Sequence, residues 1–157
     1  MDGDIALVVS NNPDAAGLAK AHAAGIATAC VNHRDYATRE DFDAALASTV
    51  TAAKPDVVVL AGFMRILTSV FLTPFSGRLL NVHPSLLPKY PGLNTHQRAL
   101  DAGDSEAGVT VHFVTQELDG GPPVLQARVP VDSGDTAETL AEKVLAEEHV
   151  IYPLAAR

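Results

Sequence analysis

Short runs of consecutive apolar residues most constrain how this chain can fold. Ile5–Val9 and Asp56–Ala61 are nearly uninterrupted apolar segments, which is typical of strands buried on both faces of a parallel sheet. Because the second run is the most apolar in the chain, we predict a central strand there. Apolar residues recur at helical spacing over 15–25 and 38–53, and strand character resumes over 26–31. The pattern predicts an α/β fold with a doubly wound, mostly parallel sheet.

In the second half of the chain, predicted strands and helices continue to alternate. A capping-box pattern at Asp135–Glu138 marks the start of the last helix, and Pro153 is expected to interrupt it. Prolines bound the segment 124–131, so we predict an antiparallel or edge strand there. The remaining predicted elements are helices over 68–75 and 95–102 and strands over 79–83 and 109–114. With 157 residues and 47% apolar content, we expect a single domain spanning 1–157.

Charge and cysteine content exclude several classes of function. The net charge is −8, and the eleven Lys and Arg residues do not cluster, which argues against a nucleic-acid partner. Cys30 is the only cysteine, so neither a disulfide framework nor a thiolate zinc site is expected. No apolar run is long enough to span a membrane, and we expect a cytoplasmic protein.

The stretch 79–92 carries the first candidate site. In a strand, Asn81 and His83 project to one face and Val82 to the other. Pro84 must end the strand, so the amide and the imidazole lie at its carboxyl tip, where α/β sheets bind ligands. The pair could alternatively cap loop backbone. The following prolines and Gly92 predict a rigid loop suited to supporting a site, and Leu87–Pro88 can be cis or trans.

Other polar residues have simple structural interpretations. Asp119 precedes a glycine pair and would ordinarily be a turn residue, and His112 on a half-buried strand is more often structural than catalytic. Glu148 is most simply solvated. The apolar loop 63–67 either packs as core or lines a pocket for a flat ligand. We find no metal-ligand spacing and expect no metal site.

Three long motifs carry a family resemblance. The stretches Ala61–Leu67, Asn81–Gly92 and Val111–Pro122 closely resemble the folate-dependent phosphoribosylglycinamide formyltransferases, and the similarity covers nearly the whole chain. Methionyl-tRNA formyltransferase and formyltetrahydrofolate hydrolase share the Asn-x-His-x-Ser strand end and the Leu-Asp loop. Their versions of residues 63–67 and 89–92 usually differ, so they rank lower.

The resemblance implies an activity and a set of site residues. The activity is transfer of the formyl group of 10-formyltetrahydrofolate to the amine of glycinamide ribonucleotide in purine biosynthesis. The implied catalytic residues are Asn81, His83 and Asp119, with Asp119 favouring the charged imidazolium of His83. The implied formyl-folate contacts are Arg39, Met64, Arg65, Ile66, Leu67 and Asn81, and the implied nucleotide contacts are Gly62, Pro84 and Glu148.

The sequence also departs from this family. Relatives begin with a further strand and a glycine- and serine-rich turn that binds phosphate, and they continue beyond the equivalent of Arg157. We therefore expect a chain trimmed at both ends that lacks the family's first β-α unit and binds the nucleotide weakly. Loss of that strand would expose an apolar sheet edge, which leaves a homodimer possible. Asn94 is often His in relatives. The alternative to an enzyme is a folate-binding module that does not catalyse formyl transfer.

Overall fold

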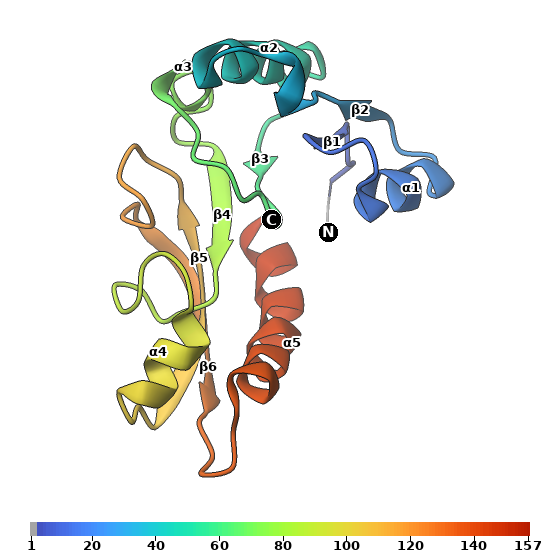
Figure 1. Ribbon diagram of the computed structural model, residues 1–157. Coiled ribbons are helices and arrows are strands. Elements are labelled where there is room, and N and C mark those ends of the chain that lie inside the picture. The colour runs from blue at the N-terminus through green and yellow to red at the C-terminus, as the bar shows by residue number, and fades with distance from the viewer. Residues whose placement is uncertain (1–2) are drawn as a thin grey trace. The chain divides into compact units, whose positions relative to one another are not determined.

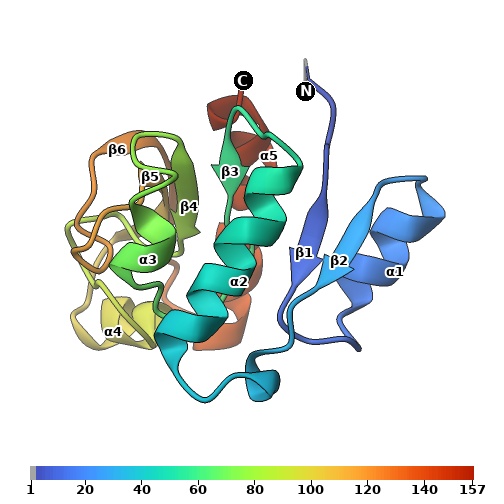
Figure 2. The same cartoon turned by 90° about the horizontal axis from the view of Figure 1, so that it is seen from above.

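A computed structural model describes residues 3–157 of the chain. Its contacts divide the chain into two compact units, one made of residues 59–63 and 76–157 and the other of residues 3–58 and 64–75. Figures 1 and 2 show the elements of each unit.

The second unit is built around a parallel strand pair. Strand β1 (Val8–Ser10) pairs with β2 (Thr28–Cys30), and helix α1 (Ala16–Ala23) connects them. A 3-10 turn, η1 (His33–Asp35), leads into helix α2 (Arg39–Ala52), whose first turn is capped by the Thr38 hydroxyl accepting from the Asp41 amide. Helix α3 (Ser69–Leu72) packs against α2.

The first unit is a four-stranded sheet covered by a long helix. Strands β3 (Val58–Val59), β4 (Leu79–His83), β5 (Glu106–Phe113) and β6 (Pro123–Pro130) lie side by side in that order. Strand β5 runs antiparallel to both β4 and β6, whereas β3 and β4 point the same way (Figure 1). The predicted α/β class, with a mostly parallel sheet and an antiparallel strand near the C-terminus, is confirmed.

The two faces of this sheet differ in chemistry. Because directly paired residues share a face, the pair Val82 and Val111 lies on one side and the pair Asn81 and His112 on the other. Helix α5 (Ala137–Ala155) buries Leu140 and Val144 against the apolar side, and helix α4 (Thr95–Asp101) adds Ala99 to the same core. The opposite side is left for polar groups.

Two sequence expectations are wrong in detail. Strand β3 ends the order of the four-stranded sheet within residues 3–157 and is not central, and Val59 is 44% exposed. An apolar composition shows that the side chains of the strand favour burial, but it does not determine how many strands pair with it. Helix α5 continues past Pro153 to Ala155, since a proline so near the end breaks few backbone bonds. No helix among residues 3–157 could cross a membrane.

The start of α5 supplies a prediction for acid stability. Asp135 accepts hydrogen bonds from Lys143 Nζ at 2.7 Å and from the Asp132 amide at 2.8 Å, which lowers its pKa from the ordinary 3.8 to about 2. A lowered pKa stabilises the fold above about pH 4, and this contribution is lost as the pH falls through about 2. We expect Asp135→Asn to lower the melting temperature at pH 7, with the difference from wild type vanishing near pH 2. Thermal unfolding followed by circular dichroism across this range tests it, and a constant difference would contradict it.

Candidate active site

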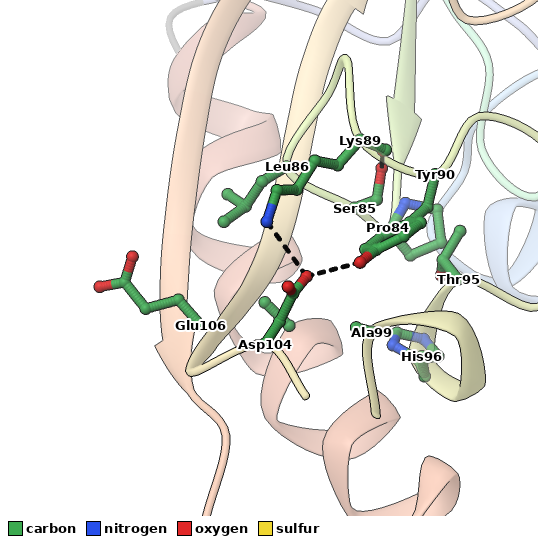
Figure 3. Close-up of a pocket in the computed structure, with 11 residues that line it drawn as sticks. Pro84, Ser85, Leu86, Lys89, Tyr90, Thr95, His96, Ala99, Asp104 and Glu106 are labelled. Atoms are coloured by element: carbon green, nitrogen blue, oxygen red, sulfur yellow. Dashed lines mark hydrogen bonds and ion pairs between the residues drawn. The ribbon is translucent and has the colours of Figure 1, made fainter. Parts of the chain in front are cut away.

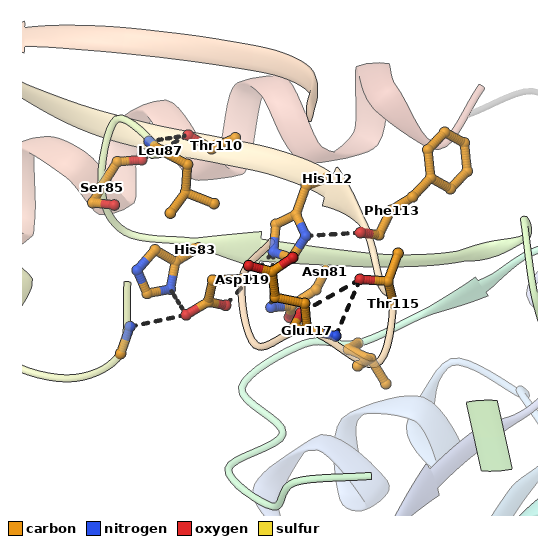
Figure 4. Close-up of polar contacts among 12 residues, drawn as sticks. Asn81, His83, Ser85, Leu87, Thr110, His112, Phe113, Thr115, Glu117 and Asp119 are labelled. Atoms are coloured by element: carbon orange, nitrogen blue, oxygen red, sulfur yellow. Dashed lines mark hydrogen bonds and ion pairs between the residues drawn. The ribbon is translucent and has the colours of Figure 1, made fainter. Parts of the chain in front are cut away.

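Three polar side chains far apart in sequence meet on the polar face of the sheet. Asn81 and His83 project from β4, and Asp119 comes from the loop between β5 and β6. Asp119 Oδ2 lies 3.4 Å from His83 Nδ1, and Figure 4 shows the carboxylate between the rings of His83 and His112. Cross-strand pairing of Asn81 with His112 brings the amide into the same cluster. The structure therefore brings the three predicted catalytic residues together.

The surroundings of His83 define where its protons lie. Nε2 is 2.8 Å from the Tyr90 carbonyl oxygen, which can only accept, so Nε2 carries a hydrogen. Nδ1 faces the Asp119 carboxylate, an arrangement that is attractive when Nδ1 also carries a hydrogen. His83 is only 6% exposed, so both contacts act with little competition from water. Both ring nitrogens therefore face acceptor oxygens.

Asp119 is held in place by backbone. Its Oδ2 accepts a hydrogen bond from the Gly92 amide at 2.9 Å. Gly92 has φ +81°, a conformation that side-chain-bearing residues rarely adopt, and this turns its amide toward the carboxylate. Asp119 itself has φ +52°, which aspartate tolerates better than most residues. The loop after β4 thus positions the acid as well as the histidine.

His112 lies beside the cluster of Asn81, His83 and Asp119. Its Nδ1 donates to the Phe113 carbonyl at 2.9 Å, which directs Nε2 toward Asn81 and Asp119. Asn81 Nδ2 lies 3.4 Å from that Nε2, so the amide nitrogen points toward the ring and keeps its second hydrogen for another partner. Asp119 Oδ1 is 3.8 Å from the same Nε2. The sequence signal for His112 was its place within the motif Val111–Pro122.

Thr110 anchors the loop that covers His83. This fully buried hydroxyl donates to the Ser85 carbonyl at 2.7 Å and accepts from the Leu87 amide at 3.1 Å. Gln126 Nε2 bonds both Thr110 Oγ1 and the Leu87 carbonyl at 2.9 Å. The Leu87–Pro88 bond, which the sequence left open, is cis. Neither Thr110 nor Gln126 was singled out from the sequence.

A small pocket lies on the far side of the same loop, against α4 (Figure 3). Asp104 accepts from Tyr90 Oη at 2.7 Å and from Lys89 Nζ at 3.2 Å within it. His96 also lines the pocket, and burial, together with the charge of His83, lowers its pKa. The pocket is lined by none of Asn81, His83 and Asp119. The hydrogen bond from Tyr90 Oη to Asp104 secures Tyr90, whose carbonyl holds His83.

The predicted ligand contacts divide between the two units. Arg39 and the residues Met64–Leu67 lie in the second unit, whereas Gly62, Pro84 and Glu148 lie in the first. Glu148 on α5 is half-buried, and this burial raises its pKa, so it is less solvated than expected. No group of three or more His, Cys, Asp or Glu side chains within residues 3–157 is arranged to hold a metal ion.

Comparison with known proteins identifies the family. The formyl transferase family model matches residues 1–156. The chain is 54% identical to phosphoribosylglycinamide formyltransferase of Escherichia coli K12 over 97% of this chain and 72% of that protein. The crystal structure of phosphoribosylglycinamide formyltransferase from Brucella melitensis superposes with a TM-score of 0.90 at 55% identity, covering 95% of this chain and 77% of that chain. Glycinamide ribonucleotide transformylase 1 from Symbiobacterium toebii gives 0.93 at 50% identity, covering 96% and 71%. The chain therefore belongs to the formyl transferase family.

Proposed function

We propose that this protein transfers the formyl group of 10-formyltetrahydrofolate to the amine of 5'-phosphoribosylglycinamide, in the cytoplasm and as a step of purine biosynthesis. The relatives that bear this enzyme name match across almost the whole chain. The observation that supports the proposal best is the 3.4 Å approach of Asp119 to His83 beside Asn81. An amide, an imidazolium and a carboxylate supply the donors and the acceptor that formyl transfer needs.

The proposed chemistry begins with attack of the substrate amine on the formyl carbon. The carbonyl oxygen then becomes an oxyanion, which donors placed beforehand stabilise more strongly than they stabilise the starting carbonyl. Asn81 Nδ2 has a hydrogen left over from its contact with His112, and the His83 ring lies two residues away on the same face. We assign oxyanion stabilisation to these two groups.

The attacking amine must also lose a proton. Asp119 is the buried acceptor of the cluster, and we assign it a double role: it keeps His83 charged and it takes up the proton, directly or through water. The formyl carbon then releases the folate nitrogen, which receives a proton as the carbon–nitrogen bond breaks. Arg39 and Met64–Leu67 are proposed to bind the folate, and Gly62, Pro84 and Glu148 the nucleotide.

Steady-state kinetics test this proposal. The purified chain is mixed with 10-formyltetrahydrofolate and glycinamide ribonucleotide, and formation of tetrahydrofolate and of formylated nucleotide is measured separately. We expect equal amounts of the two products and no folate turnover when the nucleotide is omitted. Asn81→Ala is expected to lower the rate by about 10²-fold or more, because it removes one oxyanion donor.

Two outcomes would contradict the proposal. Formate release without nucleotide would identify a formyltetrahydrofolate hydrolase. Folate binding in calorimetry without turnover at high nucleotide concentration would identify a binding module that lacks catalysis.

A further inference from the structure

Asp43 is a buried carboxylate in the second unit, on the otherwise apolar face of α2. It is 1% exposed, and its neighbours on that face, Phe42, Leu46 and Ala47, are also buried. Among residues 3–157, no Lys, Arg or His side chain forms an ion pair with it. A buried charge is unfavourable unless hydrogen bonds compensate it, so its partners indicate what the residue does.

Both hydrogen bonds of Asp43 come from Thr68. The Thr68 amide lies 2.5 Å and its hydroxyl 2.7 Å from Asp43 Oδ2, whereas Oδ1 has no protein partner. Thr68 precedes α3, where a threonine hydroxyl commonly caps the helix, but here it makes no capping bond. The hydroxyl binds the carboxylate on α2 instead. Asp43 therefore fixes the point at which the loop 64–67 ends.

A second contact holds the same loop from the neighbouring position on α2. The guanidinium carbon of Arg65 lies 5.4 Å from the centre of the Phe42 ring, a cation–π distance. Arg65 and Leu67 are half-buried, whereas Met64 is 80% and Ile66 59% exposed. The loop is thus attached to α2 at residues 65 and 68 and presents the two apolar side chains outward. Arg39 lies one helical turn before Phe42 and Asp43 on the same side of α2.

We propose that Asp43 is a positioning residue for binding of the formyl folate: by holding Thr68 it fixes the loop Met64–Leu67 beside Arg39. This inference rests on the proposed function, in which that loop and Arg39 contact the folate. Asp43 has no part in the chemistry, so its loss should weaken folate binding and leave the transfer step nearly unchanged.

Calorimetric titration with tetrahydrofolate and steady-state kinetics test the role. Asp43→Ala is expected to raise the dissociation constant and the folate KM about 10-fold, with kcat at saturating folate within about threefold of wild type. Asp43→Asn retains an oxygen that accepts from Thr68 and is expected to restore most of the affinity. Thr68→Val keeps the hydrogen bond from the backbone amide to Asp43 and should weaken folate binding less than Asp43→Ala does. It tests the same contact if Asp43→Ala fails to fold.

Thr49→Val is the matched control. Thr49 lies on the same helix and donates one hydroxyl hydrogen bond of 2.9 Å to the Ala45 carbonyl, a bond within α2 that does not involve the loop 64–67. Its loss should leave folate affinity unchanged.

The effects of Asp43→Ala and Thr68→Val on folate affinity should be less than additive when the two are combined, since both remove the same contact.

Hydrogen exchange of the amides of residues 64–67 separates this inference from the proposed function. Faster exchange in the Asp43 and Thr68 variants, but not in Thr49→Val, supports the positioning role. If wild type binds tetrahydrofolate and the Asp43 and Thr68 variants bind it equally well, the inference is overturned while the proposed function stands. If wild type binds no folate, the proposed function fails, and unchanged exchange in the variants would overturn the positioning role as well.

Discussion

Replacing His83 with alanine is expected to lower kcat by about 10²-fold to 10⁴-fold, the largest effect on activity that we predict. The ring lies between two acceptors, the Tyr90 carbonyl and the Asp119 carboxylate. A charged donor in a site closed to water stabilises a developing oxyanion far more than it stabilises the substrate. The KM values should change much less than kcat, and steady-state kinetics with each substrate varied in turn measures both.

The same measurement on Asp119 tests whether the two residues act as one unit. Asp119→Asn keeps a side-chain oxygen for the Gly92 amide but removes the negative charge that faces His83. We expect the double variant to be about as slow as the slower single variant, because groups that act together lose their function together. Fully multiplicative losses would show that they act independently. His22→Ala, on the exposed face of α1, is the control and should retain wild-type rates.

Gly108→Ala is expected to have the largest effect on stability. Gly108 lies in β5, where a methyl group would be 2.0 Å from the Ala127 carbonyl oxygen and 2.6 Å from Leu86 Cδ2. The Leu86 side chain can rotate away, but the carbonyl belongs to the neighbouring strand β6 and cannot move without breaking the pairing. We expect a loss of about 3 kcal/mol, at the upper end for overpacking. Urea unfolding measures the midpoint and slope.

Gly17→Ala is the matched control for this substitution. Gly17 lies in α1 and has nothing within 4 Å of the position of an added methyl group. Alanine there should raise stability by about 0.5 kcal/mol, because it restricts the unfolded chain and favours helix. A Gly108→Ala protein with an unchanged midpoint would contradict the close approach of β5 and β6.

Local pattern alone predicted most of the elements and two of the three candidate catalytic residues. The alternation of side chains in a strand placed Asn81 and His83 on one face, and Pro84 marked where that strand ends. The motif resemblance added Asp119, whereas local pattern made it a turn residue. Helix starts were also predictable from the sequence. At α5, however, the capping box joins Thr136 and Thr139 and not Asp135 and Glu138, because the helix begins one residue later than the pattern suggested.

The period of each segment could be read from the sequence, because hydrophobic spacing and proline act within a few residues. Which polar groups meet depends instead on the folded chain. The register of β4 against β5 places His112 opposite Asn81, and the loop path brings Gly92 to Asp119 and Thr68 to Asp43. These contacts join residues between 25 and 31 positions apart, and long-range packing, which no local pattern encodes, fixes them.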